Sequence, residues 1–157
     1  MPEDLSANAL GSAQAHNRTS IPDLSVMDVI GNLKYFAADV PFSCTGPTAA
    51  EGDKILWSCA ASARSERGSY EVTVVGDDPL TIFSVTATVH GVSQETAASF
   101  FSYVAGLCLR DTDPLNPEAW MQENVPTGGQ TATGGKALSV YGAKEVRTLE
   151  VVAIGAF

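Results

Sequence analysis

Three cysteines have the most reactive side chains in this 157-residue chain, and their surroundings differ. Cys44 lies in a Pro- and Gly-containing segment that predicts a loop, and Cys59 lies in an apolar run that predicts a strand. A disulfide between them would close a loop of about fifteen residues and stabilise the fold by roughly 3 kcal/mol in the chain-entropy model. We therefore expect a Cys44–Cys59 disulfide, with unpaired thiols in a reducing compartment as the alternative. Cys108 falls on an apolar helical stripe and is expected to be unpaired and unreactive.

Motifs that carry nucleophilic or acid–base catalysis are missing from the sequence. Its histidines are His16 and His90, and the sequence neighbours of His90 supply no partner for a general base. No Gly-x-Ser-x-Gly, Cys-x-x-Cys or His-Glu-x-x-His pattern occurs. We expect a non-catalytic protein without a cofactor. The alternative is an enzyme that pairs Glu71 or Glu95 with another carboxylate for hydrolysis.

Two loops partly match ligand-binding motifs and differ from them at positions that the chemistry requires. Residues 130–137 resemble a phosphate-binding loop, but Gln130 replaces its first glycine and Ala137 replaces its metal-binding hydroxyl residue. Asp111 and Asp113 begin like a calcium-binding loop, but the glycine and the bidentate glutamate of that loop are missing. We expect no phosphate site and no metal site, and interpret both segments as turns.

Two tryptophans mark a candidate binding groove. An indole is large and carries an N–H donor that needs a partner, so tryptophans often remain partly exposed. Trp57 lies beside the expected disulfide, and Trp120 lies on a predicted short helix. We place a candidate ligand or protein groove between them.

The strongest structural pattern runs from residue 70 to residue 109 and predicts two strands followed by a helix. Apolar and polar residues alternate over residues 70–75 and 80–89, with a turn between them. Ser93 is placed to cap a helix. Apolar residues then recur at spacings of three and four, at Ala97, Phe100, Phe101, Val104, Leu107 and Cys108. We expect this stripe to pack on the strand face formed by Phe83, Val85, Ala87 and Val89.

The opposite face of the same strands is rich in threonine. It would carry Glu71, Thr73 and Val75 from one strand and Ile82, Ser84, Thr86 and Thr88 from the other. Such a face can meet water in a monomer and can receive a protein partner or a second subunit. We expect binding through Thr86 and Thr88. The alternative is that residues 114–135 fold over this face and bury it.

The remaining segments complete one domain. Residues 1–21 predict a flexible leader, and residues 22–157 a single α+β domain. We expect a first helix over residues 25–38, a short helix over 117–124, and further strands over 54–61, 136–141 and 147–154, with 130–133 as a further candidate edge strand. The predicted architecture has two layers, an antiparallel sheet of about five strands with helices on one face, in the order α-βββ-αα-ββ.

This order of elements resembles the secretion-chaperone-like fold, which has a first helix, a three-stranded meander, a second helix and a returning hairpin. The resemblance covers residues 23–154 and transfers no motif residue. The segments Phe42-Ser-Cys44, Trp57-Ser-Cys59 and 119–124 are also similar to parts of uncharacterised domains of bacterial exported proteins and lipoproteins. The first resemblance implies a dimerising chaperone, and the second implies no known activity.

Charge and hydropathy narrow the class of partner. The chain has 9 Lys+Arg against 18 Asp+Glu, a formal charge of −9, without a basic run that could contact nucleic acid or anionic lipid. No stretch reaches the roughly 18 apolar residues of a membrane span, so we expect no membrane insertion within this chain. Its start lacks the pattern of a signal peptide, so we expect either no such peptide or one already removed.

The preferred interpretation is a binding module of a bacterial extracytoplasmic protein, either secreted or anchored to the envelope. We expect its partner to be another protein or a second copy of itself. The alternative is a cytosolic chaperone-like or regulatory domain that dimerises. These interpretations depend on the cysteine pair, the acidic balance and the order of elements.

Overall fold

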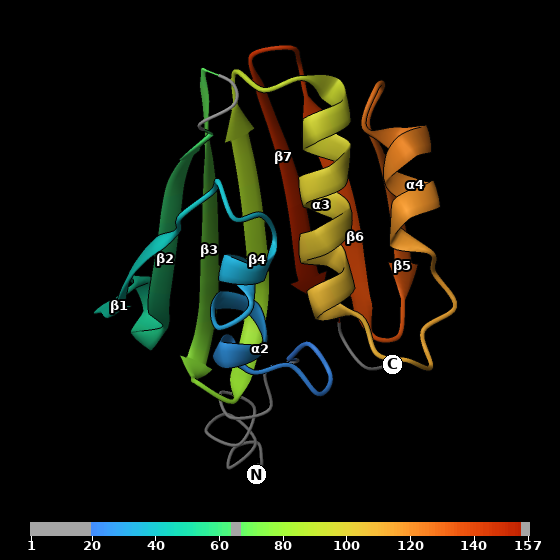
Figure 1. Cartoon of the computed structure of the whole chain (residues 1–157). Helices are drawn as coiled ribbons and strands as arrows, with labels where there is room; N and C mark the ends of the chain where they lie inside the picture. Colours follow the sequence, from blue (N-terminus) through green and yellow to red (C-terminus); the bar gives the residue numbers. More distant parts are fainter. Residues whose placement is uncertain (1–19, 64–66, 155–157) are drawn as a thin grey trace, which may run out of the picture.

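Alternating apolar residues of the central segment form two long strands in the middle of a seven-stranded sheet. The computed structural model describes residues 20–63 and 67–154. β3 (Gly68–Asp78) and β4 (Thr81–His90) pair antiparallel. All neighbouring strands are antiparallel, in the order β1-β2-β3-β4-β7-β6-β5 (Figure 1). The other strands are β1 (Ser43–Ala49), β2 (Ile55–Ala63), β5 (Gly129–Thr133), β6 (Lys136–Gly142) and β7 (Val146–Ala153).

The described α-helices cover one face of this sheet. They are α2 (Val26–Ile30), α3 (Gln94–Cys108) and α4 (Pro117–Asn124), and the short 3-10 turns η1 (Leu33–Tyr35) and η2 (Glu51–Asp53) complete the helical elements. Figure 1 shows the three α-helices in front of the strands. The predicted α+β class, with an antiparallel sheet, is confirmed.

The core lies between α3 and the central strands. Ser93 caps α3 by accepting a hydrogen bond from the Thr96 backbone N–H at 3.1 Å. Phe100 and Phe101 on α3 are 0% exposed, which confirms the predicted apolar stripe, and burial of each phenylalanine contributes about 1.5–3 kcal/mol. The strand residues buried in this core include Val72, Val74, Val85, Ala87, Leu149 and Val151.

The sheet has two more strands than the five that the sequence predicts. β1 forms in the segment that predicts a loop, and β5 forms at the position of the candidate edge strand. Every residue of β1 is exposed, and its register with β2 shifts between Thr45 and Thr48. An exposed, irregular edge strand with Gly46 and Pro47 has no apolar alternation, so the pattern that identifies buried strands is absent there.

A bulge in β4 moves Phe83 out of the core position that the sequence predicts for it. Val75 pairs with Ser84 while Gly76 pairs with Ile82, so Phe83 is an extra residue on its strand. Ile82 therefore takes the core position and is 0% exposed, whereas Phe83 is partly exposed. The Lys54 Nζ atom lies 5.9 Å from the centroid of the Phe83 ring. The expectation was wrong for Phe83, and the buried Val85, Ala87 and Val89 confirm it for the rest of the strand.

The first helix is much shorter than the predicted range 25–38. Ser25 and Asp28 form a capping box at the start of α2, which ends after five residues at the C-cap Gly31. Glycine and the following Asn32 have low helix propensity, and the Asn32 side chain donates a hydrogen bond to the Asp28 carbonyl at 2.9 Å. Apolar burial at helical spacing continues across the break, because Leu33 in η1 is 0% exposed.

The N-terminal boundary of the domain also differs slightly from the prediction. Residues 1–19 of the expected leader lie outside the described residues. Ile21, the last residue of that leader, is 2% exposed, and its backbone N–H donates a hydrogen bond to the Ile82 carbonyl at 2.7 Å. Ile21 therefore belongs to the packed fold, joined to the bulged end of β4.

Candidate functional site

One face of the sheet carries no described helix, and we call it the open face. Its side chains come from alternate positions of neighbouring strands, and strand pairing brings them into one surface. Thr73 lies opposite Thr86 on β3 and β4, and Thr88 lies opposite Thr148 on β7. The central part of the open face consists of Glu71, Thr73, Val75, Ser84, Thr86, Thr88, Thr148, Glu150, Val152, Ala137, Ser139 and Tyr141.

Residues 114–135 do not cover the open face. They supply α4, which packs beside α3 on the helical side, and β5, which extends the sheet beyond β6 (Figure 1). Thr86 and Thr88 are partly exposed between their strand neighbours. The alternative in which this segment buries them is therefore wrong, because its two elements are used elsewhere in the fold.

Side chains on the open face form a few hydrogen bonds with one another. The Thr88 and Thr148 hydroxyl oxygens lie 3.4 Å apart. The Tyr141 hydroxyl donates to the Glu150 carboxylate, and this hydrogen bond is the main reason why the pKa of Tyr141 is raised, with smaller contributions from burial and the carboxylate charge. At the other side, His90 Nε2 lies 3.7 Å from a Glu71 carboxylate oxygen.

The open face also exposes apolar groups. Tyr141 is 47% exposed and Val152 is 39% exposed, and both lie on the half of the face formed by β6 and β7. Glu71 and Glu150 are the acidic side chains on its central strands. The surface therefore combines hydroxyl groups, a few exposed apolar groups and negative charge.

The structure does not bring the two predicted tryptophans together. Trp57 is 5% exposed, contrary to expectation, because β2 is an internal strand and Trp57 faces the core opposite Val74. Trp120 lies on α4 and is partly buried against the core. Figure 1 shows β2 and α4 at opposite sides of the domain, so the two indoles come from elements that lie far apart.

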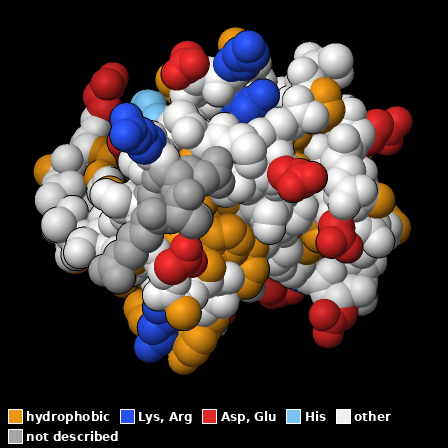
Figure 2. Space-filling view, turned by 45° about the horizontal axis from the view of Figure 1, so that its top comes forward, with side chains coloured by type: hydrophobic (Ala, Val, Ile, Leu, Met, Phe, Trp, Pro, Cys, Tyr) orange, Lys and Arg blue, Asp and Glu red, His pale blue; other side chains and the backbone are white. Residues whose placement is uncertain are grey.

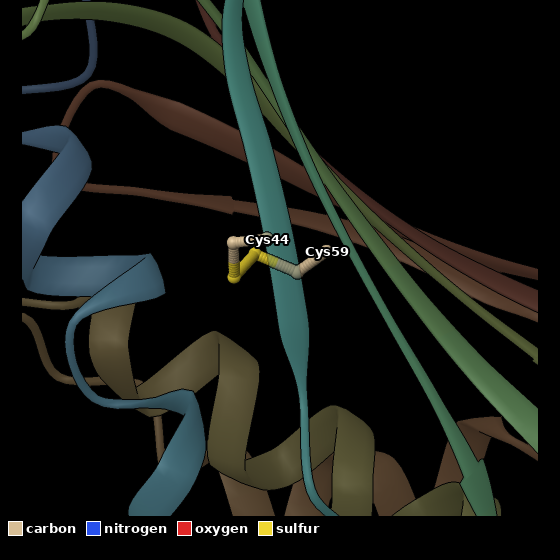
Figure 3. The surroundings of a disulfide bond; sticks show 2 residues. All are labelled: Cys44 and Cys59. Carbon is tan, nitrogen blue, oxygen red and sulfur yellow. A yellow bond between two sulfur atoms is a disulfide. The ribbon is translucent and has the colours of Figure 1, made fainter.

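The predicted disulfide is present. Cys44 on β1 and Cys59 on β2 are directly opposite each other, with their Cα atoms 4.0 Å apart and their sulfur atoms bonded at 2.04 Å (Figure 3). Cys108 is a free, buried cysteine, and burial raises the pKa of its thiol to about 12. A thiol held in its neutral form has little nucleophilic reactivity.

A shallow cleft lies on the helical side of the molecule, between α3, α4 and Phe36. It measures about 680 Å³ and is lined by Phe36, Ser99, Ser102, Tyr103, Glu95 and Glu118, among others. Figure 2 shows isolated Asp and Glu side chains around an apolar area on this side of the molecule. Within residues 20–63 and 67–154, no cluster of His, Cys, Asp or Glu side chains could hold a metal ion.

A buried ion pair joins the two loops that partly resemble ligand-binding motifs. The Lys136 Nζ atom lies 2.7 Å from an Asp113 carboxylate oxygen, and their side chains are 0% and 2% exposed. Lys136 also donates to the Gly134 carbonyl at 3.2 Å, and the Arg110 backbone N–H donates to Asp113 at 2.8 Å. The lysine and the aspartate therefore neutralise each other. Sequence spacing alone gives no sign of this pair, because 23 residues separate its members.

Burial and the surrounding hydrogen-bond donors shift the pKa of Asp113 in opposite directions. Burial tends to raise the pKa of this carboxyl group, but the hydrogen bonds from Lys136 and Arg110, together with their positive charges, hold the pKa below its usual value. Asp113 is therefore ionised at neutral pH and supplies the negative charge of the ion pair with Lys136.

Comparison of the chain with protein-family models, with curated proteins and with solved structures found no match. Within the described ranges, no helix has the length and apolarity to cross a membrane.

Proposed function

We propose that this chain is a non-catalytic binding module of a bacterial extracytoplasmic protein and that its open face receives a protein partner. The observation that carries the proposal is the layering of the sheet. One face packs against the described helices, whereas Thr86, Thr88 and their neighbours lie on a broad face that no described element covers.

The composition of the open face supports a protein as the partner. A hydroxyl-rich surface with exposed Tyr141 and Val152 offers both hydrogen bonds and apolar contact. The formal charge of the chain is −9, and Glu71 and Glu150 add negative charge to the face itself. We therefore expect the partner to present basic side chains around an apolar centre.

The disulfide supports the proposed compartment. Disulfides persist in secreted proteins and in the bacterial periplasm, and they are rare in the reducing cytosol. The Cys44–Cys59 bond attaches the exposed strand β1 to β2, where few apolar contacts are available to hold it.

The proposal can be tested with a matched pair of charge variants. Thr88→Arg places a long cation in the middle of the open face, and Gln122→Arg adds the same charge at an exposed position of α4. A partner is captured from the exported fraction of the source cell by cross-linking, purified separately and titrated against each protein. Thr88→Arg is expected to weaken binding at least about tenfold, as for a central interface residue.

The control variant Gln122→Arg is expected to bind within about twofold of the parent, because it lies on the helical side. Equal affinity for Thr88→Arg and the parent would remove the open face as the binding surface. An equal loss of affinity in Thr88→Arg and Gln122→Arg would also remove the open face as the binding surface, since the helical side would then be involved.

A further inference from the structure

The two edges of the sheet differ in their protection against pairing with another strand. β1 carries Pro47, which lacks a backbone N–H, and has a register shift between Thr45 and Thr48. Such interruptions prevent a further strand from adding in regular register. The β1 edge is therefore a poor template for strand addition.

β5 has neither the proline nor the register shift that interrupts β1. It pairs with β6 over five consecutive positions, from Gly129 opposite Val140 to Thr133 opposite Lys136, without a register shift. Its sequence, Gly-Gln-Thr-Ala-Thr, contains no proline and no charged residue. In the described part of the chain, no strand pairs with its outer side. Its outer edge therefore has the regular geometry that can extend a sheet.

We propose that β5 pairs antiparallel with β5 of a second copy of this chain, around a two-fold axis at Thr131. The inference does not depend on the proposed function of the open face. In this register Gln130 lies opposite Ala132 of the other copy, and Gly129 lies opposite Thr133. A C2 contact of this kind uses the same patch on both copies, as most homodimers do.

Charge does not oppose a second copy at this edge. The chain carries −9 overall, so most contacts between two copies would bring like charges together. β5 is a neutral strand, and self-pairing places no like charges directly opposite one another. The strand is therefore a part of this acidic molecule where two copies can approach without repulsion between facing side chains.

The dimer would extend the sheet and its open face. Antiparallel addition at β5 produces one continuous sheet from two seven-stranded halves, with the open faces on the same side. A specific interface usually buries about 1,200–2,000 Å² in total, and five residues of strand supply only part of this area. We therefore expect a reversible dimer with a Kd on the order of 10–100 μM.

The register can be tested at two exposed positions of β5. Gln130→Glu with Ala132→Glu places carboxylates opposite one another across the two-fold axis, and should raise the dimer Kd roughly tenfold or more. Gln130→Lys with Ala132→Glu places opposite charges across the same axis and should keep the Kd within about threefold of the parent. Sedimentation equilibrium of the full chain from about 5 to 500 μM measures the association.

A matched control places the same charge at the other edge. Ser43→Glu with Thr45→Glu adds two carboxylates to exposed positions of β1 and should leave the Kd unchanged within about twofold. Circular dichroism and thermal melting show that each variant is folded. A parent chain that stays monomeric to 500 μM overturns the inference, as do equal effects of the two glutamate pairs. A chain that stays monomeric and still binds its partner through the open face would overturn the β5 dimer and leave the proposed function standing.

Discussion

The buried ion pair of Asp113 and Lys136 shows how one side chain depends on another inside this fold. Replacement of Asp113 by alanine leaves the Lys136 ammonium without its carboxylate in a position that is 0% exposed. We expect a loss of roughly 3–5 kcal/mol in the free energy of unfolding, measured by urea denaturation. Asp111→Ala, an exposed position in the same turn, is the control and should change stability by less than about 0.5 kcal/mol.

The lowered pKa of Asp113 predicts a pH dependence of stability. A carboxyl group whose pKa is lower in the folded state than in the unfolded state stabilises the fold above its unfolded value, about 3.9 for aspartate. That contribution is lost as the pH falls through the lower, folded-state pKa. The difference in unfolding free energy between the parent and Asp113→Asn should be constant near neutral pH and shrink below about pH 4. A difference that grows on acidification would contradict this assignment.

The three cysteines predict a simple thiol count. Protein denatured without reductant should react with one equivalent of a thiol reagent, at Cys108, since Cys44 and Cys59 are bonded. Native protein should react far more slowly, because Cys108 is 2% exposed and burial raises its thiol pKa to about 12. Three reactive thiols in the denatured, unreduced protein would show that the disulfide does not form in solution.

At the scale of elements, the disulfide stabilises the edge strand β1. The bond closes a loop across 15 residues, and its removal should lower the free energy of unfolding by about 3 kcal/mol. Cys44→Ala is the suitable variant, because Cys44 is exposed whereas Cys59 is buried, so the substitution leaves little cavity. Reductant should destabilise the parent and leave Cys44→Ala unchanged. Equal sensitivity of both proteins to reductant would contradict this role.

Elements with a regular pattern could be predicted from the sequence. β3 and α3 have alternation and helical spacing that match their burial, because each packs one face on the same core. β1 lacked such a signal because none of its residues is buried. The bulge at Phe83 was also hidden, since an extra residue in a strand leaves the composition unchanged and only shifts which residue faces inward.

Only part of the open face could be predicted from the sequence. The threonine-rich face containing Thr86 and Thr88 followed from alternation along one strand. Its extension over β7 and β6 did not, because the insertion of β7 beside β4 depends on tertiary pairing of distant segments. The expected groove between Trp57 and Trp120 was wrong for the same reason, because the separation of β2 and α4 in the fold cannot be obtained from residue types.

At the scale of the whole molecule, layering on one side of the sheet predicts that neighbouring residues of β4 respond very differently to the same substitution. Val85 is 0% exposed beneath the helices, whereas Thr86 is partly exposed on the open face. Val85→Lys would bury a charge without a partner and should cost more than about 4 kcal/mol or prevent folding. Thr86→Lys can extend its ammonium into water and should cost less than about 1 kcal/mol.

Urea denaturation, with soluble expression as a second readout for Val85→Lys, measures this contrast within one strand. The two positions are adjacent in the same strand, so the difference between their losses in unfolding free energy mainly reports that one sheet face is covered and the other is not. A loss above about 3 kcal/mol for Thr86→Lys would mean that the open face is covered in solution. Concentration then separates the two ways of covering this face: a loss that disappears on dilution would identify a second copy packed on the open face, whereas a loss independent of concentration would identify the chain itself.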